Sequence, residues 1–177
     1  MLNKVKKSKL ITLDLQDYYD DTEVVEFDLK DYLYMEFVLK EKDFRAALDE
    51  HDWSRYDGKY LAVFCSTDAI VASWAYMLVA THARKHAKDV LFGNRQEVLH
   101  ELYRRNIDAV DWSEYKNERV LLKGCSDKEL PPSVYLLATQ KLMPHTDRLM
   151  YGEACSFVPV YRKPKEEKEQ EKEKVKE

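Results

Sequence analysis

Two kinds of hydrophobic pattern alternate along this chain, and they alternate twice in the same order. A short apolar run is followed by a long stretch whose apolar residues recur with a helical period, and then by a second short run. The first copy of this series lies at 59–64, 69–86 and 89–92, and the second at 119–124, 131–145 and 148–151. Each copy predicts a strand, a helix and a second strand.

The same motif precedes both copies. The sequence Asp-Trp-Ser-x-Tyr occupies residues 52–56 and again residues 111–115. Aspartate and serine cap turns through their side chains, and tryptophan and tyrosine bury large rings. We therefore expect each copy of the motif to form a turn that its aromatic residues anchor to the core.

Strands that alternate with helices of this length predict an α/β protein with a mainly parallel sheet and flanking helices. We expect one α/β domain over residues 1–162, built on a duplicated strand-helix-strand unit. Its predicted parts are an irregular N-terminal α+β extension (1–51), repeat one (52–110) and repeat two (111–162). Within the extension, the pattern predicts strands at 10–15 and 23–27 and short helices at 29–36 and 42–50.

Composition adds information about the end of the chain and about which partners to expect. Residues 163–177 are almost entirely lysine and glutamate, which predicts a solvated, disordered tail. The net charge of −4 is spread evenly, so nucleic acid is not an expected partner. No apolar segment has the length of a signal peptide or a membrane span, so we expect a cytoplasmic protein with no membrane partner.

Cysteine provides the candidate chemistry, because each of the three cysteines is followed directly by serine. Cys65 and Cys125 occupy matching places at the carboxyl ends of predicted strands, the edge at which parallel sheets bind ligands. Cys155 lies beyond the last predicted strand. Residues that could cap the following helices, and so favour a thiolate or hold a cofactor, are Ser66, Thr67, Ser126 and Asp127.

If the strand ends meet at one edge, the three thiolates could hold zinc or an iron–sulfur cluster. The predicted ligands are Cys65, Cys125, Cys155 and, at the fourth position, Glu153, with His86 or His145 as weaker candidates. Such a protein would carry a cluster, assemble one or use one.

Two other interpretations stay open. Cysteine is often buried and inert, so the protein could be a non-catalytic interaction protein with structural cysteines. It could instead be a cysteine-dependent transferase or redox enzyme in which one thiol is assisted by His82, His86 or His145. The sequence does not decide whether the protein is an enzyme.

Several segments also resemble a known family. They are Ser-Lys-Leu at 8–10, Asp14, Val-Leu-Lys-Glu-Lys-Asp-Phe-Arg at 38–45, His-Asp-Trp-Ser at 51–54, Cys-Ser-Thr-Asp-Ala-Ile at 65–70, Trp-Ala-Tyr-Met-Leu at 74–78, Lys-Gly-Cys-Ser at 123–126 and Gly-Glu-Ala-Cys-Ser-Phe-Val-Pro at 152–159. Together they resemble an uncharacterised bacterial family catalogued as domain of unknown function 2480.

The resemblance covers nearly everything before the charged tail. The chain lacks two prolines of the family pattern, one near Val71 or Ala72 and one at 84–86, which affects helix ends but not the Cys-Ser positions. The resemblance implies no activity. It implies iron–sulfur assembly proteins as partners.

Overall fold

The computed structural model describes residues 10–124, 127–128 and 130–166, and it groups the chain into two compact units. One unit is a single segment, Asp20–Leu102, which we call the continuous unit. The other combines Met1–Tyr19 with Tyr103–Glu177, and we call it the discontinuous unit. The continuous unit is thus inserted in the sequence of the discontinuous one, where a single domain with one sheet was expected.

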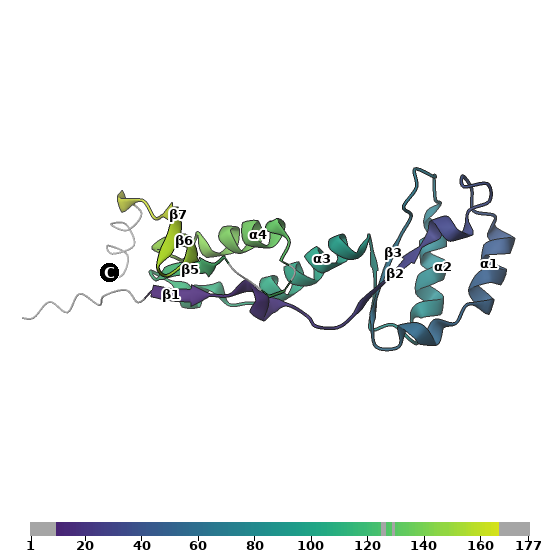
Figure 1. Ribbon diagram of the computed structural model, residues 1–177, viewed down its shortest axis with the longest axis horizontal. Coiled ribbons are helices and arrows are strands. Elements are labelled where there is room, and N and C mark those ends of the chain that lie inside the picture. Colours follow the sequence, from purple (N-terminus) through teal and green to yellow (C-terminus); the bar gives the residue numbers. More distant parts are fainter. Residues whose placement is uncertain (1–9, 125–126, 129, 167–177) are drawn as a thin grey trace, which may run out of the picture. The chain divides into compact units, whose positions relative to one another are not determined.

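The continuous unit is a parallel sheet with helices on both faces (Figure 1). Its strands are β2 (Val24–Asp28), β3 (Tyr60–Phe64) and β4 (Asp89–Phe92), with β3 in the centre. The helices α1 (Glu41–Glu50) and α2 (Ser73–Ala83) pack on the face formed by Leu61 and Val63. The first half of α3 (Arg95–Asp108) packs on the opposite face, through Val98 and Leu102.

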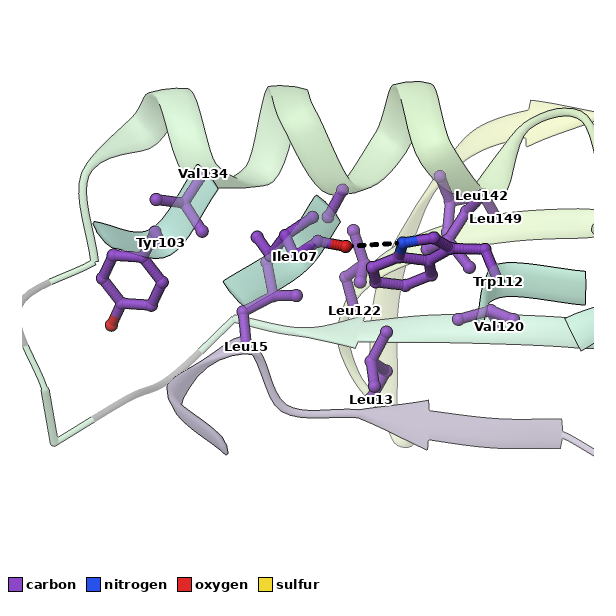
Figure 2. Close-up of a cluster of buried hydrophobic side chains, with 11 residues drawn as sticks. Leu13, Leu15, Tyr103, Ile107, Trp112, Val120, Leu122, Val134, Leu142 and Leu149 are labelled. Carbon is purple, nitrogen blue, oxygen red and sulfur yellow. Dashed lines mark hydrogen bonds between the residues drawn. The ribbon is translucent and has the colours of Figure 1, made fainter. Parts of the chain in front are cut away.

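The discontinuous unit contains a four-stranded sheet in the order β1-β5-β6-β7. The strands β1 (Leu10–Leu13), β5 (Arg119–Lys123) and β6 (Arg148–Glu153) are parallel, and β7 (Ser156–Arg162) is antiparallel to β6. Figure 2 shows the core of this unit, in which side chains from α4 (Pro132–Leu142) and from the second half of α3 meet those of β1 and β5.

The mainly parallel α/β fold is therefore confirmed, and four α-helices lie in the part of the chain that the structure describes. Two helices are shorter than their periodic stretches: 69–86 contains α2, and 131–145 contains α4. Each is preceded by a residue with extended backbone, Ala72 or Pro131. Apolar residues outside the helices still pack against the core, so the pattern extends beyond the helical backbone.

The Asp-Trp-Ser-x-Tyr motif forms the predicted turn in both units. Trp53–Tyr56 and Trp112–Tyr115 are 3-10 helices, and the aspartate before each accepts a hydrogen bond from a serine N–H, at 3.1 and 3.0 Å. The indole of Trp53 donates to the Leu48 carbonyl at 2.8 Å, and that of Trp112 to the Ile107 carbonyl at 2.9 Å (Figure 2). Each tryptophan thus ties its turn to the end of the preceding helix.

The N-terminal 51 residues, expected as an irregular extension, supply one strand to each of the two sheets. β1 pairs with β5 of the discontinuous unit, and β2 pairs with β3 of the continuous unit. Each N-terminal strand thereby supplies an edge of a different sheet, so a boundary at residue 51 cuts through both units. Strand pairing buries the apolar faces of β1 and β2 in separate cores, and this long-range pairing leaves no local trace in the sequence.

β7 was not predicted. It returns beside β6 through a tight turn at Ala154-Cys155, so Cys155 lies at the tip of a hairpin. The turn depends on Gly152, whose φ of +129° lies in a region that residues with a side chain rarely adopt. A Cβ added at Gly152 would meet the Ser156 carbonyl oxygen at 2.6 Å.

We expect Gly152→Ala to destabilise the protein by about 2 kcal/mol or more, because it combines backbone strain with a clash against backbone of β7. Urea unfolding followed by circular dichroism measures this loss. Asn117→Ala is the matched control in the same unit: Asn117 has a φ of +61° and already carries a Cβ, so its change should cost only about 1 kcal/mol. Equal losses would contradict the role of the close approach at Gly152.

Candidate functional site

The carboxyl edges of the two sheets are the candidate sites, since loops that follow parallel strands meet there. In the continuous unit, β3 ends at Phe64 and the Cys65-Ser66 pair follows. In the discontinuous unit, β5 ends at Lys123, and Gly124 follows it. The next pair, Cys125-Ser126, lies outside the described residues. Both predicted strand ends are thus in place, but only one Cys-Ser turn can be described.

An aspartate from the neighbouring strand holds the Cys65-Ser66 turn. Asp28, the last residue of β2, accepts hydrogen bonds through Oδ1 from the backbone N–H of Ser66 and of Lys30, both at 3.0 Å. Partial burial acts to raise the pKa of the Asp28 carboxyl, but these hydrogen bonds outweigh burial, and the net shift is downward. Asp28 is therefore an ionised anchor for this turn.

The predicted helix caps beside the cysteine are wrong. α2 begins at Ser73, and Ala72, which has no side-chain hydrogen bond, occupies its cap position. The backbone N–H of Ser66 instead donates a hydrogen bond to Asp28, and the Thr67 hydroxyl lies 3.3 Å from the Cys65 sulfur. Cys65 thus lies several residues before the helix, and the helix dipole decays within one turn. Asp127 is also not a helix cap, because α4 begins at Pro132 and Pro131 occupies its cap position.

Tyr76 of α2 contributes an aromatic wall to the same edge. Burial raises the pKa of its hydroxyl, and electrostatic interactions with Cys65 and Asp28 raise it further. The Tyr76 ring packs edge-on against Phe92, at the end of β4, with the ring centroids 5.3 Å apart. Cys65 is half-buried beside this pair and is a free thiol.

The discontinuous unit carries a related arrangement with different charges. Asp14 follows β1, and its Oδ2 accepts a hydrogen bond from the Lys123 ammonium at 2.7 Å. Burial acts to raise the pKa of Asp14, but the bonds from Lys123 and Gln16 lower it overall. Tyr135 of α4 donates its hydroxyl proton to the Lys123 carbonyl at 3.3 Å and packs edge-on against Tyr151, at 5.4 Å.

A pocket of 490 Å³ opens at this second edge. Its walls combine aromatic, aliphatic and cationic side chains with bare backbone: Gly124, Lys128, Leu130, Pro132, Tyr135 and Tyr151. Small-molecule sites have this size and this mostly apolar lining. Gly124, which lines the pocket, is the residue before Cys125 in the sequence.

Glu153 is the last residue of β6, and Cys155 lies in the turn that follows this strand. The Gly124 N–H donates to the Gly152 carbonyl at 3.2 Å, so the loop that contains Cys125 starts beside the residue that precedes Glu153. The Oε1 atom of Glu153 is buried and has no hydrogen-bond partner among the described residues. Cys155 is exposed and is a free thiol.

The predicted site residues are thus divided between the units. Cys65 belongs to the continuous unit, whereas Cys155 and Glu153 belong to the discontinuous unit. Among the described residues, no group of three or more histidine, cysteine, aspartate or glutamate side chains is arranged to hold a metal ion. The shared site of three cysteines stays a prediction.

Two of the candidate histidines have carboxylate partners outside any cysteine site. His86 Nδ1 lies 2.6 Å from Asp57, and His82 Nε2 lies 3.8 Å from Asp49. The ring of His82 also stacks on Trp53, with the centroids 5.5 Å apart. These contacts favour structural surface roles for both histidines.

Asp14 and Asp28 are the residues that sequence reasoning missed. The signal was present, because Asp-Leu-x-Asp-Tyr occurs at 14–18, directly after β1, and again at 28–32, beginning at the last residue of β2. In both copies the first aspartate caps a 3-10 helix by accepting the N–H two residues later.

Comparison with known proteins places the chain in a family. A family model described as "Protein of unknown function (DUF2480)" matches residues 1–163. The chain belongs to the DUF2480 family. No curated protein and no solved structure matches this DUF2480 member. Among the residues that the structure describes, no helix combines the length and apolar character needed to cross a membrane.

We expect Asp28→Ala to destabilise the protein by about 1–3 kcal/mol, because the N–H groups of Ser66 and Lys30 lose their acceptor. It should also speed the labelling of Cys65 by a thiol reagent. Asp68→Ala is the control, since it removes the same charge from an exposed residue next to the turn. Unchanged Cys65 labelling in the Asp28 variant would contradict the anchoring role.

The same pair of variants tests the charge of Asp28. Its folded-state pKa is lowered, so it contributes stability above the unfolded value near 3.8, and this contribution is lost as pH falls through the folded-state pKa. Urea unfolding between pH 3 and pH 7 should show a smaller acid loss in Asp28→Ala than in Asp68→Ala. Parallel pH profiles would contradict the lowered pKa.

Proposed function

We propose that this DUF2480 protein binds a metal ion or an iron–sulfur cluster at the carboxyl edge of the discontinuous unit, through Cys125, Cys155 and Glu153. The buried Oε1 of Glu153, which has no hydrogen-bond partner among the described residues, is the observation that supports this site best. A carboxylate oxygen taken out of water needs a donor or a cation to offset its lost hydration. The charge of Lys123 acts on Glu153 without a hydrogen bond to Oε1. A bound metal would supply the direct partner that Oε1 lacks.

The chain order also supports the proposal. Cys125 directly follows Gly124, which hydrogen-bonds to Gly152, and Glu153 and Cys155 come one and three residues after Gly152. Thiolate and carboxylate are ligands that zinc accepts, and thiolates hold iron–sulfur clusters. A fourth position would belong to another ligand or to a substrate.

This site has fewer ligands than the one predicted from the sequence, because it does not include Cys65. Cys65 lies in the other unit, where its sulfur is 3.3 Å from the Thr67 hydroxyl and Asp28 holds the N–H of the next residue, Ser66. The protein would carry or assemble clusters, with iron–sulfur assembly proteins as partners. The exposed Cys155 thiol would then be accessible to a cluster that a partner delivers or receives. That role rests on the family resemblance and is part of the proposal.

Metal analysis of protein purified without oxygen tests the proposal. The wild-type chain should contain stoichiometric zinc or iron, and Cys125→Ser, Cys155→Ser and Glu153→Gln should each lose most of it. Cys65→Ser is the matched control and should keep the metal. Metal-free wild-type protein would overturn the proposal, and an equal loss in Cys65→Ser would overturn the site with fewer ligands.

A second candidate is an interaction protein, favoured by large exposed apolar side chains at matching sequence positions of the two units. In the continuous unit Met77 is 67% exposed and Phe92 76% exposed. The corresponding positions of the discontinuous unit hold Leu136, 63% exposed, and Tyr151, 39% exposed. Exposed apolar groups gathered in one place mark surfaces that bind other proteins.

A photo-crosslinking residue placed at Met77 or at Leu136 tests this candidate. We expect both positions to capture the same partner in cells, identified by mass spectrometry as an iron–sulfur assembly protein. The control position is Lys85, an exposed residue just past the end of α2, because Thr81 is one turn from Met77 on the same helix face. Capture at Lys85 as efficient as at Met77, or no capture at either apolar position, would contradict the interaction role.

We further propose that the two units derive from one duplicated unit. Both contain an N-terminal strand, an Asp-Leu-x-Asp-Tyr turn, an Asp-Trp-Ser-x-Tyr turn and a strand-helix-strand segment. The two carboxyl edges would then be related sites whose charges and ligands have diverged.

A further inference from the structure

Three arginines lie side by side across the sheet of the discontinuous unit. Arg119 of β5 is paired with Arg148 of β6, and Arg148 is paired in turn with Arg162 of β7. Paired residues on neighbouring strands hold their side chains about 5 Å apart on one face. The pairing therefore builds a row of three guanidinium groups.

The row lies on the face of the sheet that points away from the core of this unit. Val120 and Leu122 of β5 and Leu149 of β6 belong to that core. Side chains alternate between faces along a strand, so Arg119 and Arg148 point to the opposite face. Arg148 pairs with Arg162 and therefore shares that face with it.

Like charges directly opposite each other destabilise a sheet. The continuous unit avoids this cost at the corresponding pair, where Tyr60 of β3 faces Asp89 of β4. There the Tyr60 side chain is buried in a cluster with Val98 and Leu102 of α3. A row of arginines is thus a property of the discontinuous unit and not a requirement of the fold.

A pocket of 350 Å³ lies over the arginine row. The three arginines line one part of this pocket. The rest of its lining is aliphatic or aromatic: Leu149, Met150, Phe157, Pro159, Val160 and Tyr161. The Nε atoms of Arg119 and Arg148 are buried and have no hydrogen-bond partner among the described residues. Asp147 Oδ2 lies 3.9 Å from Arg148 Nε, which is too far for a hydrogen bond.

We propose that this pocket binds the phosphate group of a small organic phosphate. Guanidinium groups match phosphate oxygens in geometry. Three positive charges favour a ligand with two negative charges, such as a phosphate, over a ligand with one, such as a carboxylate. The apolar part of the pocket would hold the organic group. The volume is that of a small-molecule site, which favours a small phosphate over a phosphorylated macromolecule.

Calorimetric titration of the full chain with phenyl phosphate, at constant ionic strength, tests the proposal. The wild-type protein should bind phenyl phosphate more tightly than inorganic phosphate, because only the former fills the apolar part. Arg148→Gln should weaken phenyl phosphate binding about tenfold or more, since hydrogen bonds between charged groups are lost. Arg45→Gln removes the same charge from α1 of the other unit and should change the affinity less than twofold.

Thermal unfolding separates a lost site from a lost fold. Without ligand, Arg148→Gln should melt at the wild-type temperature or above it, because a like-charge contact is removed. Phenyl phosphate should raise the melting temperature of the wild-type protein but not that of Arg148→Gln. If Arg148→Gln does not fold, Arg162→Gln on the exposed edge strand serves the same purpose.

Two results would overturn the proposal. One is that the wild-type chain does not bind phenyl phosphate, or that Arg148→Gln and Arg162→Gln both bind it as tightly as the wild-type chain does. The other is binding to vesicles of an anionic phospholipid without binding to phenyl phosphate, which would assign the row to a membrane surface instead.

Discussion

The parallel pairing of the two N-terminal strands with β5 and β3 is the constraint on which the rest of this structure depends. Both sheets are built around a short strand with a buried apolar centre that needs a neighbour on each side, and in each case one neighbour comes from the first 28 residues. Without β1 and β2, the backbone of β5 and β3 would have unpaired N–H and C=O groups along one edge.

The same pairing positions the chemistry. Asp14 and Asp28 come directly after or at the end of the N-terminal strands, so parallel pairing carries each carboxylate to the loop after the central strand. Asp28 then anchors the Cys65-Ser66 turn, and Asp14 pairs with Lys123. An antiparallel arrangement would have placed both carboxylates at the opposite edge.

The two units carry different chemistry at their carboxyl edges. The edge of the continuous unit has an anchored thiol, Tyr76 and exposed apolar side chains. The edge of the discontinuous unit has a pocket, a lysine–aspartate pair and the buried oxygen of Glu153. Only the discontinuous unit adds β7, which completes the arginine row and places Cys155 at a hairpin tip. The proposed metal and phosphate sites both rest on this added strand.

Local patterns in the sequence were enough to predict the parallel α/β fold, the two strand-helix-strand series and the Asp-Trp-Ser-x-Tyr turns, because each depends on residues close together in the chain. The Asp-Leu-x-Asp-Tyr repeat was equally visible, but it indicates only that two turns are alike and not which sheet each preceding strand joins. Tertiary structure alone decided that β1 and β2 join different sheets, that Cys65 and Cys155 belong to different units, and that three arginines line up across β5, β6 and β7. Those features depend on the pairing of strands far apart in the chain. Pairing is chosen by burial of whole faces, and no short window of residues records it.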